Sequence, residues 1–334
     1  MMKNRKLLYS VLISCFIIVA GFSIYFYYQT QKLTNQVSEA TTVDEELPSY
    51  HFTLIGEEMD HDYWRLVGEG AKKTEQNYDV WVEYVGPRRS NPEEQLKLFD
   101  IAIKSKVDGI IVQALNDDFL PMIDKAMEKG IPVITIDTDA PDSMRSTYIG
   151  TDNYVAGQLA GRALVEDTGG EATVGIVTGS FSNSHHQLRV EGFKDIVEKE
   201  AGIEIVAIEE SNITRVIAEE KAYQMLTEYP DITALYGTSS LDGIGMTAAA
   251  DSLGMDDVYM MTFDTLPENI KLLEQEKLDV LIEQKPFEMG HRSIELMLEI
   301  MKGNQVEDVY HTDAKVVKKE DLDEPGIEEG NRYD

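Results

Sequence analysis

Side chains suited to hydrogen-bonding a small molecule follow several short apolar runs of this chain. The run Val133–Ile136 leads directly into Asp137 and Thr138. Other runs lead into residues of similar character, namely Glu57, His61, Tyr63, Trp64, Arg189, Ser239, Asp264 and Gln284. Carboxylates accept hydrogen bonds from hydroxyl groups, amide and guanidinium groups donate them, and aromatic rings pack on apolar C–H surfaces. The set therefore suits a neutral, polyhydroxylated ligand.

Each of these positions taken alone has a simpler explanation. Asp, Ser and Thr are common after strands because they cap helices and form turns. Polar residues that follow six separate apolar runs are harder to explain in that way. Together they favour a binding site that recognises a ligand.

The order of the predicted elements places these residues at the ends of strands. Strands are expected at His51–Ile55, Val80–Val85, Gly109–Val112, Pro132–Ile136, Thr173–Thr178, Ile203–Glu209, Ala234–Tyr236, Tyr259–Phe263 and Val280–Glu283, with a further short run at 146–149. Helices are expected at Tyr63–Asn77, Pro92–Ser105, Phe119–Lys129, Gln187–Ala201, Arg215–Tyr229, Gly243–Leu253, Pro267–Gln275 and Glu288–Lys302. This alternation predicts an α/β fold with parallel sheets and helices on both faces.

The alternation falls into two series with the bend Gly150–Asn153 between them. Two series indicate two doubly wound lobes. Open α/β sheets bind ligands outside the carboxyl ends of their strands. We therefore expect the ligand between the lobes.

The N-terminus has the pattern of a membrane anchor. Three basic residues lie within positions 1–6, and the 22 residues 7–28 carry no charge. About 20 apolar residues are enough for a helix to cross a membrane. The basic flank predicts a cytoplasmic N-terminus and an extracytoplasmic folded region. Residues 29–49 are polar and acidic and predict a linker.

Cys15 offers an alternative form of attachment. It follows Leu12, Ile13 and Ser14 in the manner of a bacterial lipobox, in which the cysteine is lipidated after cleavage. A secretory apolar segment usually stops at its cleavage site, whereas here 13 uncharged residues follow Cys15. The length favours the uncleaved anchor, and both forms tether the folded region to the membrane.

The composition limits the classes of partner. The 61 acidic residues outnumber the 30 basic ones, which gives a net charge of −31. Such a charge repels DNA, RNA and anionic lipid. Because Cys15 is the sole cysteine, the sequence allows neither an internal disulfide nor a multi-cysteine metal site.

Three other motif-like signals carry little weight. Gly243–Ala248 resembles a dinucleotide fingerprint, but that fingerprint must directly follow a strand, and here six residues intervene. His185 and His186 could suggest zinc, but adjacent side chains point to opposite sides in most backbones. Ser184, His185 and Asp264 could form a triad on paper, yet the GxSxG motif is absent. We predict no catalytic residue, no metal and no cofactor.

The region from His51 to Val317 resembles the ribose/galactose-type periplasmic sugar-binding proteins, the receptors of sugar ABC importers. Their fold also forms the effector core of LacI-type repressors. The segments that carry the resemblance are 133–137 (VITID), 149–153 (IGTDN), 189–193 (RVEGF), 263–264 (FD) and 284–286 (QKP).

The resemblance implies roles for individual residues. Tyr63 and Trp64 match the aromatic residues that enclose the sugar ring, and Asp137 and Asp264 match the sugar-binding carboxylates. The other matched positions are Arg189 for the arginine of the C-terminal lobe, Gln284 for the hinge-side amide and Ser239 for a frequent asparagine.

Four positions depart from the ribose-binding pattern. Thr138 stands where an arginine is common, and Glu57 and His61 replace small neutral residues. Ile213 stands where a third aromatic ring often packs. The fold and the pocket are therefore expected, but ribose is not expected as the ligand.

The resemblance also implies an arrangement of the lobes. The N-terminal lobe is expected at 51–150 and 285–310, and the C-terminal lobe at 151–284 and 311–318, followed by an acidic tail at 319–334. The hinge residues are expected to be Gly150, Thr151, Gln284, Lys285 and His311.

The expected function is capture of a sugar or related polyol by a monomer for an ABC importer. The alternative is a membrane-anchored subunit that reports sugar to a histidine kinase or chemoreceptor. A LacI-type regulator is disfavoured, because it requires an N-terminal DNA-binding domain where this chain has an apolar segment. The expected location is a cell membrane, crossed once, with the folded domain extracellular or periplasmic.

Overall fold

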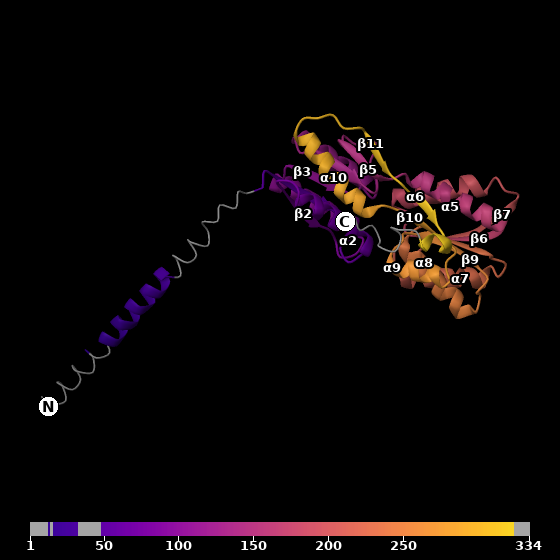
Figure 1. The fold of residues 1–334 in the computed structure, drawn as a ribbon, viewed down its shortest axis with the longest axis horizontal. Coiled ribbons are helices and arrows are strands. Elements are labelled where there is room, and N and C mark those ends of the chain that lie inside the picture. The colour runs from indigo at the N-terminus through magenta and orange to yellow at the C-terminus, as the bar shows by residue number, and fades with distance from the viewer. Residues whose placement is uncertain (1–12, 14–15, 33–47, 324–334) are drawn as a thin grey trace, which may run out of the picture. The chain divides into compact units, whose positions relative to one another are not determined.

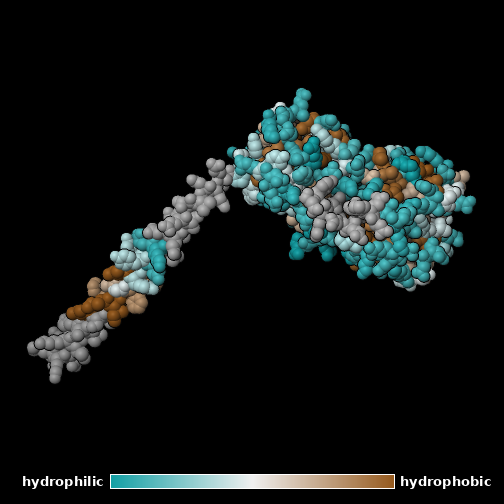
Figure 2. All heavy atoms as spheres, viewed as in Figure 1, coloured by the Kyte–Doolittle hydropathy of each residue, from teal (hydrophilic) through white to brown (hydrophobic). Residues whose placement is uncertain are grey.

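The computed structural model describes residue 13, residues 16–32 and residues 48–323. The chain divides into two compact units, Met1–Pro48 and Ser49–Asp334. In the first unit residues 16–32 are helical. Residues 29–32, where the linker was expected to begin, therefore still belong to this helix. Apolar side chains such as Phe16 and Phe22 are exposed on this helix (Figure 2).

Among the described helices, none is both long and apolar enough to span a membrane. The expected basic flank, the first part of the expected anchor with Cys15, and most of the expected linker lie outside the described residues. The anchor and the linker therefore stay predictions.

The second unit contains two six-stranded sheets, which form the two lobes in Figure 1. The first sheet has the order β11-β5-β4-β3-β1-β2 and consists of β1 (Tyr50–Ile55), β2 (Val80–Val85), β3 (Gly109–Val112), β4 (Val133–Ile136), β5 (Thr147–Thr151) and β11 (Val309–Thr312). The second has the order β12-β10-β9-β8-β6-β7 and consists of β6 (Glu171–Thr178), β7 (Gly202–Glu210), β8 (Ala234–Gly237), β9 (Tyr259–Phe263), β10 (Val280–Glu283) and β12 (Lys315–Val317).

Helices cover both faces of each sheet. On the first sheet, α2 (Asp62–Glu75) and α10 (Pro286–Met301) pack on one face, and α3 (Pro92–Ser105) and α4 (Leu120–Glu128), preceded by the 3₁₀ turn η1 (Asp117–Phe119), pack on the other. On the second sheet, α5 (Asn153–Thr168) and α6 (Ser184–Val197) pack on one face, and α7 (Arg215–Glu228), α8 (Ser240–Leu253) and α9 (Pro267–Glu274) pack on the other. Central strands such as β3 and β4 are buried at every position because helices cover both of their faces.

The paired strands run parallel except β10 and β12. In both sheets the chain order reverses beside the first strand, between β1 and β3 and between β6 and β8. Reversal points of this kind leave a crevice at the carboxyl ends of the strands, where α/β proteins bind ligands. The predicted two-lobe α/β fold with parallel sheets is confirmed.

Glycine allows two helix pairs to pack closely. A Cβ atom on Gly70 of α2 would lie 2.0 Å from a backbone oxygen of α10. A Cβ atom on Gly157 of α5 would lie 2.2 Å from the carbonyl oxygen of Arg189 in α6, and one on Gly192 would lie 2.0 Å from a carbonyl oxygen of α5. The contact of α5 with α6 therefore fixes the position of the helix that carries Arg189.

The structure corrects four details of the sequence analysis. Helix α6 begins at Ser184 instead of Gln187, and α8 begins at Ser240 instead of Gly243, because polar first turns obscured their starts. His311 pairs with Gly150 inside β11, so the third passage between the sheets comes at 313–314, after the expected position. The first part of the expected tail forms the 3₁₀ turn η2 (Lys319–Asp323), because apolar Leu322 is buried in the second lobe.

Candidate functional site

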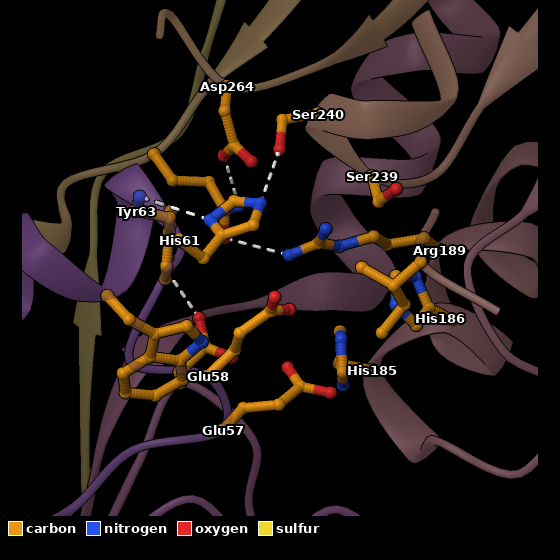
Figure 3. A pocket seen from close by; sticks show the side chains of 14 residues that line it. Glu57, Glu58, His61, Tyr63, His185, His186, Arg189, Ser239, Ser240 and Asp264 are labelled. Carbon is orange, nitrogen blue, oxygen red and sulfur yellow. Dashed lines mark hydrogen bonds between the residues drawn. The ribbon is translucent and has the colours of Figure 1, made fainter. Parts of the chain in front are cut away.

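A cavity of about 430 Å³, including its open mouth, lies between the carboxyl ends of the two sheets. Four carboxyl groups, five aromatic or imidazole rings and one guanidinium group dominate the lining (Figure 3). The lining residues are Glu57, Glu58, His61, Tyr63, Trp64, Asp137, His185, His186, Arg189, Ile213, Ser239, Ser240, Asp264 and Gln284.

The loop between β1 and α2 and the first turn of α2 supply the aromatic part of the site. Gly56 opens this loop, and a Cβ atom there would lie 2.8 Å from the ring of Trp64, so glycine leaves room for the indole. His61 caps α2 through its side chain, because Nδ1 accepts a hydrogen bond of 3.2 Å from the backbone N–H of Tyr63. A neutral imidazole with Nδ1 as acceptor carries its proton on Nε2. Nε2 lies 3.3 Å from the hydroxyl oxygen of Ser240 in the other lobe.

Two aspartates occupy matching positions in the two lobes. Asp137 follows β4 and Asp264 follows β9, and both have a left-handed backbone, with φ angles of 65° and 72°. The backbone N–H of Asp137 donates a hydrogen bond of 2.9 Å to the carbonyl oxygen of Ile149 on the neighbouring strand. The N–H of Asp264 donates one of 2.9 Å to the carbonyl oxygen of Ile282 in the same way. Non-glycine residues rarely adopt this conformation, and it concentrates at functional sites. The unusual backbone directs both carboxyl groups into the cleft.

Asp137 is held by donors from the first lobe. The hydroxyl of Tyr63 donates to its carboxylate, as does Nε2 of Gln113 at 2.9 Å. The hydroxyl oxygen of Thr138 lies 3.2 Å from the same carboxylate. Thr138 itself is not among the residues that line the cavity and lies behind Asp137.

The second lobe contributes Arg189, whose guanidinium group is buried over the ring of Phe263, 3.9 Å from its centre. Nε donates to Asn153 at 2.8 Å, and the two Nη atoms donate to the carbonyl oxygen of Thr238 and to Oε1 of Gln284, each at 2.8 Å. Nε2 of Gln284 in turn donates to Asp264 at 2.7 Å. This chain of hydrogen bonds fixes the guanidinium group, whose charge opposes the rise that burial causes in the pKa values of both aspartates.

Burial shifts the ionisation of the cleft residues. Desolvation raises the pKa of Glu57 to about 7 and that of Asp264 to about 6, and it also raises the pKa of Asp137. Desolvation lowers the pKa of His61 to about 4. At neutral pH the imidazole of His61 is therefore an uncharged donor beside carboxyl groups that need hydrogen-bond donors. Such a site can bind hydroxyl groups strongly.

The structure brings nine of the ten expected ligand residues to this one cavity, and Thr138 is the exception. Of the expected hinge residues, Gly150 and Thr151 end β5, and Gln284 and Lys285 lie between β10 and α10. The hydroxyl of Thr151 donates to Oε1 of Gln284 at 2.9 Å, which joins two of the passages between the sheets. Their role as a hinge stays a prediction.

Four lining residues from the second lobe were not among the expected ligand residues, namely His185, His186, Ile213 and Ser240. The expectation that the two adjacent histidines point apart was wrong. Their rings lie 4.0 Å apart, because α6 already includes both residues and a helix turns only about 100° per residue. Glu58, in the first lobe, was also missed. The sequence did contain a signal for the residues of the second lobe, because the segments that follow β6 and β8 are rich in polar residues.

Comparison with known proteins finds a matching family and solved structures of similar fold. The family model described as periplasmic binding protein domain matches residues 52–305. The crystal structure of GanP, a glucose-galactose binding protein from Geobacillus stearothermophilus, is 51% identical, with a TM-score of 0.81, over 82% of this chain and 99% of GanP. The XylFII-LytSN complex contains a chain that is 34% identical, with a TM-score of 0.78, over 81% of this chain and 98% of that one.

A curated sugar-binding protein is also similar to this chain over most of its length, at lower sequence identity. The ribose import binding protein RbsB of Escherichia coli strain K12 is 24% identical over 80% of this chain and 90% of its own length.

Proposed function

This chain belongs to the periplasmic binding protein domain family, and we propose that it binds a neutral monosaccharide in the cleft. A hexose of the glucose or galactose type is the proposed ligand class. The similarity to GanP, at 51% identity over nearly all of that protein, supports this class. The curated and structural relatives are binding proteins, so the proposal involves no reaction.

One observation carries the proposal, namely the pair of aspartates that meet from opposite lobes. Asp137 and Asp264 line the same cavity as Arg189, whose charge acts on both carboxyl groups. Adjacent hydroxyl groups of a sugar can donate to the carboxylates, and a sugar oxygen can accept from the guanidinium group. The Trp64 indole offers an apolar face to the C–H groups of the ring.

Thermal-shift measurement against glucose, galactose, ribose, allose, xylose and inositol tests the proposal. A ligand at 100 times its Kd stabilises the folded protein by about 2.7 kcal/mol. Glucose or galactose is expected to give the largest shift. Equal melting temperatures across the panel, with the protein folded, would contradict the proposed ligand class.

Sugar binding is proposed to favour the closed arrangement of two lobes. The proposed lobes comprise residues 51–151 with 285–312, and 152–284 with 313–323, which includes the correction from β11. A ligand shifts a conformational equilibrium only by its difference in affinity for the two states. Contacts made at once with Asp137 and Asp264 would provide that difference.

The closed protein is proposed to deliver its sugar to an ABC importer. A second candidate is a receptor that docks on a signalling partner and reports sugar without transporting it. The 34% identity to the XylFII chain, which was solved as a complex with LytSN, favours this candidate. Deletion of the chain separates the two, because loss of sugar uptake supports transport, whereas loss of a sugar-induced transcriptional response with normal uptake supports sensing.

Residues 7–28 are proposed to anchor the folded domain outside the cell membrane, with attachment of a lipid to Cys15 as the alternative. The absence of charge over 22 residues supports the first form. Mass spectrometry of the mature chain decides between them. The uncleaved anchor predicts an intact N-terminus and no effect of Cys15→Ser, whereas the lipoprotein predicts cleavage before a lipid-modified Cys15.

A further inference from the structure

Asn183 occupies the N-cap position of α6 but does not use its side chain as a cap. An asparagine at this position ordinarily accepts a hydrogen bond from the first turn of its helix. Asn91 does so for α3, where Oδ1 accepts from the backbone N–H of Glu94 at 3.0 Å. The side chain of Asn183 instead crosses the cleft, and Nδ2 donates to Oε1 of Glu57 at 3.2 Å.

The other lobe holds the start of α6 at two further points. The backbone N–H of Ser184 donates to the carbonyl oxygen of Leu115 at 3.0 Å. Nδ1 of His185 lies 2.9 Å from the hydroxyl oxygen of Thr138. The positive end of the α6 helix dipole therefore lies close to the Glu57 carboxyl group. The observed arrangement caps α6 with groups of the opposite lobe.

We propose that Asn183 controls the sugar affinity of the cleft by exchanging partners, bonding Glu57 when the lobes are closed and capping α6 when they separate. This inference rests on the proposed function. Opening the cleft breaks the contacts with Glu57 and Leu115, and it leaves the first turn of α6 with unpaired N–H groups. Once Nδ2 of Asn183 is released from Glu57, the side chain turns and Oδ1 accepts a hydrogen bond from one of these N–H groups.

The chemistry of the side chain suits both roles. The amide of asparagine offers a donor for a carboxylate and an acceptor for a helix N–H group. Aspartate could serve only as the cap, because an ionised carboxylate cannot donate. Asn183 is buried and is not among the residues that line the cavity. It therefore acts as a positioning residue, and it should affect every bound sugar to a similar degree.

The charge of Glu57 determines the strength of this contact. Four ionisable groups lie around it, namely Glu58 in the same loop, Arg89 beside Glu58, Asp137 at the end of β4 and His185 on α6. Burial keeps His185 neutral by lowering its pKa. Because burial raises the pKa of Glu57 to about 7, a change of pH from 5.5 to 8 changes its charge.

Asn183→Asp tests the exchange of partners. Aspartate caps a helix about as well as asparagine, so α6 keeps its cap in the open state. At pH 8 the new carboxylate faces ionised Glu57 and weakens closure. At pH 5.5 protonated Glu57 can donate to the new carboxylate. We expect the affinity for glucose or galactose to fall at least about tenfold at pH 8 and less than about threefold at pH 5.5, relative to wild type at each pH.

Two further variants complete the design. Asn91→Asp makes the same substitution at the N-cap of α3 and is expected to leave affinity unchanged, which controls for the added charge. In a Glu57→Gln background the amide at position 57 can donate to the carboxylate introduced at position 183, so Asn183→Asp is expected to cost less than about twofold at both pH values. The proposal would be overturned if Asn183→Asp lowered the sugar affinity equally at pH 5.5 and 8. It would also be overturned if the loss of affinity persisted in the Glu57→Gln background.

A measurement without sugar separates this inference from the proposed function. Spin labels at Arg88 and Val216 report the separation of the lobes. Arg88 lies in the loop after β2 with its side chain 88% exposed, and Val216 lies in the first turn of α7 and is 74% exposed. The full chain is used in detergent with Cys15→Ser. Asn183→Asp is expected to shift the distance distribution toward longer values at pH 8 but not at pH 5.5. An unchanged distribution at pH 8 would refute the exchange, whether or not a sugar binds.

Discussion

Replacement of Glu57 by glutamine should stabilise the protein at alkaline pH more than at acidic pH. Glu57 is 6% exposed, and burial raises its pKa from 4.5 to about 7. A carboxyl group whose pKa rises on folding favours the folded state fully below its unfolded pKa. That advantage is lost as the pH rises through the folded pKa. The wild type should therefore lose stability between about pH 4.5 and 7.

The shift sets the magnitude of the effect. A difference of 2.5 pKa units, from 4.5 to about 7, corresponds to about 3 kcal/mol when the group is fully ionised. About 2 kcal/mol of this stability is lost between pH 5.5 and 8. Both pH values lie above the isoelectric point of about 4.5. Glutamine removes the ionisation but loses the hydrogen bond from Gln113, which offsets about 1 kcal/mol.

Urea unfolding of both proteins at pH 5.5 and 8 measures the effect. The unfolding free energy of Glu57→Gln, relative to wild type, should increase by about 2 kcal/mol between the two pH values. Glu204→Gln, at an exposed position of β7, controls for the loss of one charge from an acidic protein and should show no comparable increase. A difference between Glu57→Gln and wild type that is the same at both pH values would refute the argument from burial.

Further predictions concern the Trp64 indole and the contact between α5 and α6 that positions Arg189. Trp64→Ala should weaken sugar binding by about 1 kcal/mol or more, whereas Trp81→Ala, at a 45% exposed position on β2, should leave it unchanged in calorimetry. Gly157→Ala should cost about 1–3 kcal/mol of stability and should also weaken sugar binding, because its Cβ atom would displace the helix that carries Arg189. Gly70→Ala makes the matching contact in the first lobe and should lower stability with a smaller loss of affinity. Equal affinity losses in the two glycine variants would count against the positioning of Arg189 by α5.

The two-lobe fold could be predicted because its signals are local. Apolar runs of strand length alternate with helical patterns, and residues such as Asp137 and Asp264 directly follow those runs. In parallel sheets, residues after strands lie at one edge, so the sequence alone indicated that these carboxylates share a site. The left-handed backbone of both aspartates carried no such signal, because it depends on the neighbouring strands that fix their N–H groups.

The contacts between the lobes could not be predicted. Asn183 and Glu57 are 126 positions apart, and neither residue type indicates a partner in another lobe. The start of α6 was missed for a related reason, because its first turn is polar and its N-cap side chain bonds elsewhere. The adjacent histidines were expected to diverge, and only the helix start at Ser184 reveals that both face the cleft.

Calorimetric titration of the full chain with glucose and galactose, for the wild type, Asp137→Asn and Asp264→Asn, tests the central claim most directly. Asparagine tolerates the left-handed backbone at both positions, so the variants should stay folded. The wild type should bind one sugar per chain, and each variant should bind about 10- to 150-fold more weakly, because a hydrogen bond to a charged group contributes about 1.5–3 kcal/mol. Unchanged affinity in both variants would contradict the binding of sugar between Asp137 and Asp264.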